Sequence, residues 1–162
     1  MSTTFRNGFY AGLMVAVALG VYLHLLWQPA RQVELHSQHL LEQIEDKDWD
    51  AIGAFLAETY ADQWQQDRAT VLLRLRAVLH YARNLKIEAQ EPMIIAGSES
   101  GKWRARITLT ADPNEVATLI QERVNALAEP FELHWKRTSR KPWDWKLVRV
   151  ENPALELPDR NF

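Results

Sequence analysis

Cysteine is absent from all 162 residues. Its absence excludes disulfide frameworks, thiolate zinc sites, iron–sulfur clusters and cysteine nucleophiles. The chain also lacks a large net charge, since the formal charge is -2 and the pI is about 6.2. No overall field therefore attracts nucleic acid, and we expect no nucleic-acid partner. The length suits one compact domain rather than two.

Charged residues are missing from one long stretch near the amino terminus. Residues 8–27, GFYAGLMVAVALGVYLHLLW, contain no Asp, Glu, Lys or Arg. As a helix, such a run spans about 30 Å, the thickness of the bilayer hydrocarbon. Tyr10 near one end and Tyr22 and Trp27 toward the other suit the two lipid–water interfaces. We therefore predict a tail and transmembrane helix in residues 1–29, with membrane lipid as a partner.

A cleaved signal peptide is the competing interpretation of this segment. Arg6 would be its charged end, and residues 18–20 (Ala-Leu-Gly) resemble a small-x-small cleavage site. The apolar run continues beyond that site to Trp27, which favours a retained anchor. Arg31 nearly balances Arg6 across the span, so the charge bias is small. We expect a single-pass protein with a cytoplasmic amino terminus and an extracytoplasmic, periplasmic domain.

Residues 30–152 have the pattern of one α+β domain, and its first half is helical. Apolar residues recur at helical spacing over 29–46, and shorter helices are expected over 48–56 and 67–82. Asp48 and Asp67 are the expected N-caps of the two shorter helices. The proline-containing residues 153–162 are expected to form an extended tail.

The second half changes to a period of two, which is typical of strands. A strand over 85–95, a turn over 97–101 and a strand over 102–110 are followed by a helix over 113–128, capped by Asp112 before Pro113. Strands over 131–136 and 143–151 complete the domain. The apolar phase changes at Val148, which indicates a bulge or burial on both faces.

The residues Asp48, Trp49, Tyr60, Trp145 and Leu147 carry a family resemblance. An Asp-Trp step after the first helix, a Tyr before the third and a closing Trp-x-Leu strand resemble the nuclear transport factor 2-like superfamily. This resemblance implies a cone of about three helices packed on a curved antiparallel sheet. Members include isomerase and dehydratase enzymes, ligand-binding domains and membrane-anchored structural subunits. The fold therefore leaves the function open.

An isomerase-like site needs a carboxylate base inside the cone and a hydrogen-bond donor opposite it. The candidates are Asp62, Tyr60, Trp64 and His80. Asp62 lies in the polar run ADQWQQD, where a solvated turn carboxylate is the ordinary expectation, so we predict no catalytic residue. Trp49, Tyr60, Trp64 and His80 are the ligand-pocket candidates, although aromatic residues in such patterns usually belong to the core.

No metal site or cofactor is expected from the sequence. His36 and His39 lie three residues apart on a helix, but no third ligand accompanies them. His134 shares a strand face with Lys136, where solvent exposure is the expected state.

The polar face of the predicted sheet carries Arg104, Arg106, Lys136 and Lys146, which we take as partner-surface candidates. A plain solvated face is an equal alternative. We expect a non-enzymatic membrane protein that acts as an accessory or assembly subunit of a larger complex, with other protein subunits or its own copies as partners. The alternatives are a tethered ligand-binding domain and an isomerase or dehydratase.

Overall fold

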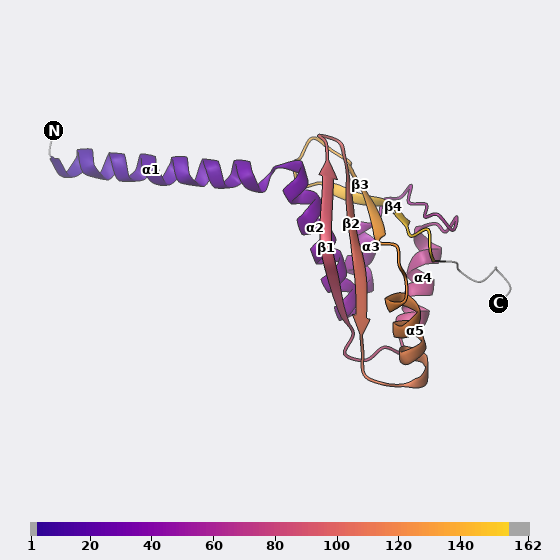
Figure 1. Cartoon of the computed structure of the whole chain (residues 1–162). Coiled ribbons are helices and arrows are strands. Elements are labelled where there is room, and N and C mark those ends of the chain that lie inside the picture. The colour runs from indigo at the N-terminus through magenta and orange to yellow at the C-terminus, as the bar shows by residue number, and fades with distance from the viewer. Residues whose placement is uncertain (1–2, 156–162) are drawn as a thin grey trace.

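The computed structural model describes residues 3–155, with side chains described for Tyr10 and from Gly12 onward. Within this range, five helices accompany a four-stranded antiparallel sheet of order β1-β2-β3-β4 (Figure 1). The α+β class is confirmed, and most of the tail predicted at 153–162 lies outside the described residues. The elements are α1 Thr3–Leu26, α2 Pro29–Asp46, α3 Trp49–Phe55, α4 Arg68–Leu79, β1 Lys86–Ala96, β2 Ser100–Thr110, α5 Glu115–Asn125, β3 Phe131–Arg137 and β4 Trp145–Glu151.

Short polar side chains set the starts of the domain's shorter helices. The Asp48 carboxylate accepts the Ala51 backbone N–H at 3.0 Å, and the Asp67 carboxylate accepts that of Thr70 at 2.8 Å, so both predicted caps are confirmed. The predicted cap of α5 is wrong. Asn114 caps that helix, and the Asp112 carboxylate instead accepts the side-chain amide of Asn84 at 2.8 Å, which ties two loops together.

Of the two alternatives for the last strand, a bulge or burial on both faces, the register of β3 and β4 shows a bulge. Trp135 pairs with Leu147 while His134 pairs with Arg149, so Val148 is the extra residue. Because of this shift, Leu147 and Val150 both contribute to the core despite their different sequence phases. A second irregularity lies in β1 between Gln90 and Met93.

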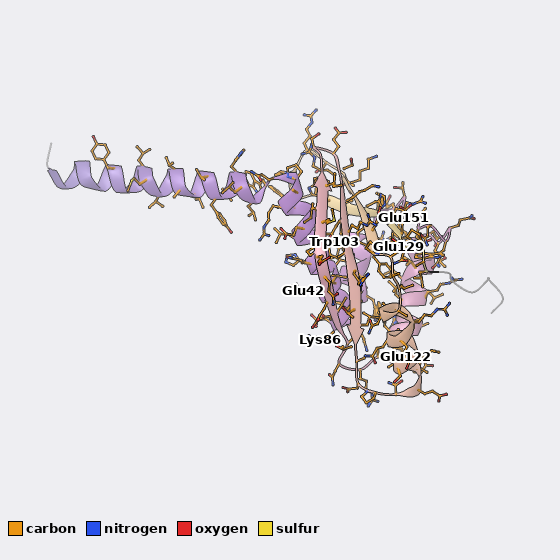
Figure 2. The ribbon with its side chains drawn as sticks, viewed as in Figure 1. Glu42, Lys86, Trp103, Glu122, Glu129 and Glu151 are labelled. Carbon is orange, nitrogen blue, oxygen red and sulfur yellow. The ribbon has the colours of Figure 1, made fainter. Side chains whose placement is uncertain are left out.

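The inner face of the sheet packs against α2 and α3. Trp103, Trp135 and Trp145 lie on this face, and each is only 1% exposed. Trp103 lies near the middle of the sheet in Figure 2. Large aromatic side chains thus fill the space between the layers. The main core consists of Val33, Leu40, Ile52, Leu56, Tyr60, Trp103, Ala105, Leu133, Trp135, Trp145 and Leu147.

Helix α1 projects away from the domain (Figure 1), and α2 begins at Pro29. Among the residues whose side chains are described, no single helix combines the length and mean hydropathy of a membrane span. Gly12–Leu26 and Pro29–Asp46 meet those criteria only as a pair, bent by 69°. At the bend the Gln32 side chain donates to the Leu26 carbonyl at 2.8 Å, which satisfies one of the last carbonyls of α1.

Candidate functional site

The four ligand-pocket candidates lie in four different settings. Tyr60 belongs to the main core. Trp49 is half-buried between the main core and a second cluster formed by Leu79, Ala82, Leu85 and Leu109. Trp64 donates its indole N–H to the Leu155 carbonyl at 2.9 Å, so it holds the start of the C-terminal segment. His80 is exposed at the end of α4, where its ring contacts Tyr81 edge-on. The interpretation of His80 as a cavity-lining residue is therefore wrong.

Asp62 is buried, contrary to the expected solvated turn carboxylate, with 4% of its surface exposed. Its Oδ1 accepts the backbone N–H groups of Trp64 at 2.9 Å and Gln66 at 2.8 Å. Burial raises the pKa of Asp62, while these two amide donors oppose the shift. Burial, together with the Asp62 charge, also raises the pKa of Tyr60. Because one carboxylate oxygen is committed to the backbone, Asp62 primarily shapes the 61–67 loop.

His36 and His39 lie in different environments. The Nδ1 of His36 lies 2.8 Å from the Gln32 carbonyl oxygen, and its ring lies edge-on to Trp135 and Phe55 at centroid separations of 5.7 and 6.0 Å. Burial lowers the pKa of His36. His39 is exposed. The structure therefore makes His36 a packing residue.

A different set of groups converges on the outer face of the sheet. Glu132 and His134 alternate along β3, and Glu151 pairs with Glu132 across to β4. Their ligand-type atoms all lie within 4.8 Å of one another, with His134 Nε2 at 3.0 Å from Glu151 Oε2 and 3.7 Å from Glu132 Oε2. All three residues are half-buried. Among the described residues, this acid–histidine cluster is the one group with metal-like spacing.

Basic side chains already compensate the acid–histidine cluster. Lys102 Nζ lies 3.6 Å from Glu132 Oε2, Arg104 Nε lies 3.6 Å from Glu132 Oε1, and Arg149 is paired with Glu151. Burial raises the pKa of Glu151, but the hydrogen bond from Arg149 and the charge of His134 outweigh it and leave the pKa below its usual value. Three cations facing two carboxylates make a divalent ion a poor competitor. The cluster fits a charge-compensated network across three strands.

The partner-surface candidates do not form a purely cationic face. Arg104 lies between Glu129, at 3.7 Å, and Glu132. Glu129 and Glu151 lie on the same side of the domain in Figure 2. Arg106 donates to the Ala128 carbonyl at 3.1 Å, and Lys146 donates to the Ala54 carbonyl at 2.6 Å. Lys136 is exposed.

An open depression of about 540 Å³ lies on this outer face beside the β1 bulge. It joins the β1–β2 hairpin to the segment that follows α5. Its lining residues are Gln90, Glu91, Met93, Arg104, Ala105, Arg106, Ala128 and Pro130.

Sequence reasoning missed the acid–histidine cluster. The Glu-x-His alternation on β3 places two of its members on one face, and that signal is visible in the sequence. The position of Glu151 opposite Glu132 depends on the strand register across the Val148 bulge, which sequence periodicity does not provide.

Comparison with solved structures decides the fold. A Novosphingobium aromaticivorans protein described as nuclear transport factor 2-like with a cystatin-like fold is 14% identical, and the match covers 85% of this chain and 88% of that one at a TM-score of 0.56. This chain has the nuclear transport factor 2-like, cystatin-like fold. No family model and no curated protein matches the sequence.

Two other solved structures match about three quarters of this chain. A Streptomyces avermitilis protein provisionally described as a dehydratase is 11% identical, with 75% of this chain and 91% of that chain covered at a TM-score of 0.55. The Bdellovibrio bacteriovorus protein Bd1075 is 9% identical at a TM-score of 0.57. That match covers 75% of this chain but only 40% of Bd1075. At these identities the likeness establishes the fold alone.

Proposed function

We propose that this chain is a non-enzymatic, single-pass membrane protein whose nuclear transport factor 2-like domain serves as an accessory or assembly subunit beside the bilayer. Helix α1 is the anchor, the amino terminus is cytoplasmic and the domain is extracytoplasmic. The partner is another protein subunit of a membrane complex or a second copy of this chain.

The exposed surface of α1 is the observation that carries this proposal. Every residue from 12 to 22 is exposed, Leu13, Met14, Val15 and Val17 by at least 50%, and at 100° per residue this apolar run of three turns covers the whole circumference of the helix. A protein partner would need one apolar stripe, whereas lipid contacts the whole circumference. The uncharged sequence of residues 8–27 supplies the length that a bilayer requires.

The interior of the domain supports a non-enzymatic role. The three sheet tryptophans occupy the inner face, and the one buried carboxylate among the former candidates, Asp62, is bonded to its own loop. The outer face offers Lys136, Arg106 and the open depression to a partner.

Membrane association tests the anchor. The full chain should float with lipid vesicles in a density gradient and resist extraction at high salt and alkaline pH. Val17→Arg should weaken flotation, because arginine at the bilayer centre costs about 2.5–3.5 kcal/mol on insertion scales. Leu73→Arg is the matched control, since Leu73 is 70% exposed on α4 in the domain. A full chain that stays at the bottom of the gradient would overturn the proposal.

Purification in mild detergent tests the subunit role. We expect the native chain to purify as a defined oligomer or with a stoichiometric partner. The double substitution Arg106→Glu with Lys136→Glu should dissociate that assembly. A monomer alone under several detergent conditions would contradict the assembly role while leaving the anchor intact.

A further inference from the structure

Two tryptophans meet where α1 joins the domain. Trp27 follows α1, and Trp143 lies in the β3–β4 turn, yet their ring centroids are only 5.9 Å apart. Trp27 is 40% and Trp143 51% exposed. An indole with one apolar face and one polar N–H is suited to the lipid–water interface. The domain therefore contributes a second interface-type aromatic side chain, Trp143, next to the one at the end of α1.

The β3–β4 turn that holds Trp143 is basic. Arg140 and Lys141 are exposed, and Arg137 at its start is half-buried. The backbone N–H of Arg137 donates to the Glu99 carbonyl at 2.8 Å, which joins this turn to the β1–β2 turn. We call Trp27, Trp143, Arg137, Arg140 and Lys141 the junction patch.

The turn has a defined conformation. The Thr138 N–H donates to the Asp144 carbonyl at 2.9 Å, and the Lys141 N–H donates to the Ser139 hydroxyl at 3.2 Å. The Trp145 indole donates to the Pro142 carbonyl at 2.8 Å. The basic side chains are thus presented from a structured turn, with little backbone ordering left to occur on binding.

The β3–β4 turn carries more basic than acidic residues. Residues 137–144 include Arg137, Arg140 and Lys141 against one acid, Asp144. Near the start of α2, Arg31 is paired with Glu34 at 2.6 Å. An anionic surface complements this excess.

The geometry of the junction keeps this surface beside the end of α1. Gln32, only 4% exposed, bonds to the Leu26 carbonyl, and α2 starts three residues after α1 ends. Figure 1 shows the β1–β2 and β3–β4 turns at the end of the domain that α1 joins, with α5 toward the other end. A bilayer that holds α1 therefore lies next to the junction patch.

We propose that the junction patch docks on the anionic headgroups of the bilayer that holds α1 and fixes the orientation of the domain on the membrane. This inference rests on the proposed membrane anchor. Trp27 and Trp143 would lie at headgroup depth, while Arg137, Arg140 and Lys141 contact lipid phosphates.

A single-cysteine label tests the docking, because the chain has no cysteine of its own. The full chain would be placed in nanodiscs of phosphatidylcholine, with or without about a third phosphatidylglycerol. A fluorophore on Ser139→Cys reports quenching by headgroup-labelled lipid. Glu122→Cys on α5 is the control position, near the opposite end of the domain in Figure 2. We expect strong quenching at position 139 only in the nanodiscs that contain phosphatidylglycerol. Quenching at position 122 should be weak in nanodiscs of either composition.

Charge reversal then separates docking from anchoring. Arg140→Glu with Lys141→Glu should reduce the ratio of docked to undocked domain by about fivefold for each basic residue lost. Arg76→Glu with Arg83→Glu is the control, with the same charge change on exposed positions of α4 and the turn after it. Equal quenching at 139 and 122 in a chain that still floats with vesicles overturns the docking and leaves the anchor. A chain that does not float overturns both.

Discussion

Trp135 of β3 donates its indole N–H to the hydroxyl of Ser37 in α2 at 2.9 Å, and both residues are at most 1% exposed. The same hydroxyl donates to the Val33 carbonyl at 2.8 Å. The sheet and its main covering helix are therefore joined by a hydrogen bond that water cannot replace without a rearrangement of the core.

Ser37→Ala should lower the free energy of unfolding by about 1–3 kcal/mol, because it leaves the buried Trp135 N–H without an acceptor. Urea unfolding of the full chain in detergent measures the change. Gln38→Ala, on the exposed side of the same helix, should change the stability by less than about 0.5 kcal/mol. Equal effects of the two substitutions would show that the indole finds another partner.

Gly101→Ala should destabilise the contact between the β1–β2 hairpin and α2. An added Cβ would lie 2.5 Å from Cγ2 of the fully buried Val33 and 3.2 Å from the Ala96 Cβ. Overpacking of this kind costs about 1–3 kcal/mol. Gly97→Ala is the matched control, since its nearest neighbour would be 3.8 Å away. Val33→Ala should partly rescue Gly101→Ala in a double-mutant cycle, and strict additivity would contradict the clash.

Asp62 should act as a structural residue whose charge is costly at neutral pH. Because burial raises its folded pKa above 3.8, its favourable contribution is complete below pH 3.8 and is lost as the pH rises through the folded pKa. Asp62→Asn keeps the acceptor for Trp64 and Gln66 and should match or exceed the native stability at pH 7. Asp62→Ala should lose about 1–3 kcal/mol. Chemical unfolding at pH 7 compares the three chains, and a severe loss in Asp62→Asn would contradict this role.

His36 should make stability fall on mild acidification. Burial lowers the folded pKa of His36 below 6.5, and the nearby charges of His39 and Lys146 lower it further. Hydrogen bonds to the backbone of Gln32 and Trp143 raise the pKa but do not outweigh burial. His36 is therefore protonated at a higher pH in the unfolded chain than in the folded chain. As a result, the free energy of unfolding declines as the pH falls from about 6.5 to the folded pKa. His36→Gln should flatten the pH dependence of stability between pH 7 and 5. His39→Gln, at an exposed position, should leave it unchanged.

The acid–histidine cluster should behave as an ion-pair network rather than a metal centre. Lys102, Arg104 and Arg149 already neutralise Glu132 and Glu151. We therefore expect no saturable binding of zinc at this cluster, and no difference in zinc binding between the native chain and Glu151→Gln. Isothermal titration of the full chain with zinc checks this. Stoichiometric binding abolished by both Glu151→Gln and His134→Ala would instead identify these residues as ligands.

Much of the site could not be predicted from the sequence, for reasons visible in particular residues. The strands predicted over 102–110 and 131–136 are present, and because side chains alternate along a strand, Trp103 and Trp135 lie on the inner face. The sequence pattern failed for Asp62, since the polar run around it concealed a compact loop packed along β4, where the Gln63 N–H donates to the Val150 carbonyl at 3.2 Å. It also failed for His80, which continues the helical path beyond Leu79 but has an exposed side chain whose ring contacts Tyr81 edge-on.

The sequence by itself determined the helix and strand order, the caps at Asp48 and Asp67, the change of apolar phase at Val148 and the long uncharged stretch before Pro29. These features depend on neighbours within a few residues, which local patterns encode. The tertiary structure decided which distant side chains meet, as when Trp27 meets Trp143 or Glu132 meets Glu151. Such contacts depend on strand register and on the path of the connecting turns, and a one-residue shift in either would move these side chains to different neighbours.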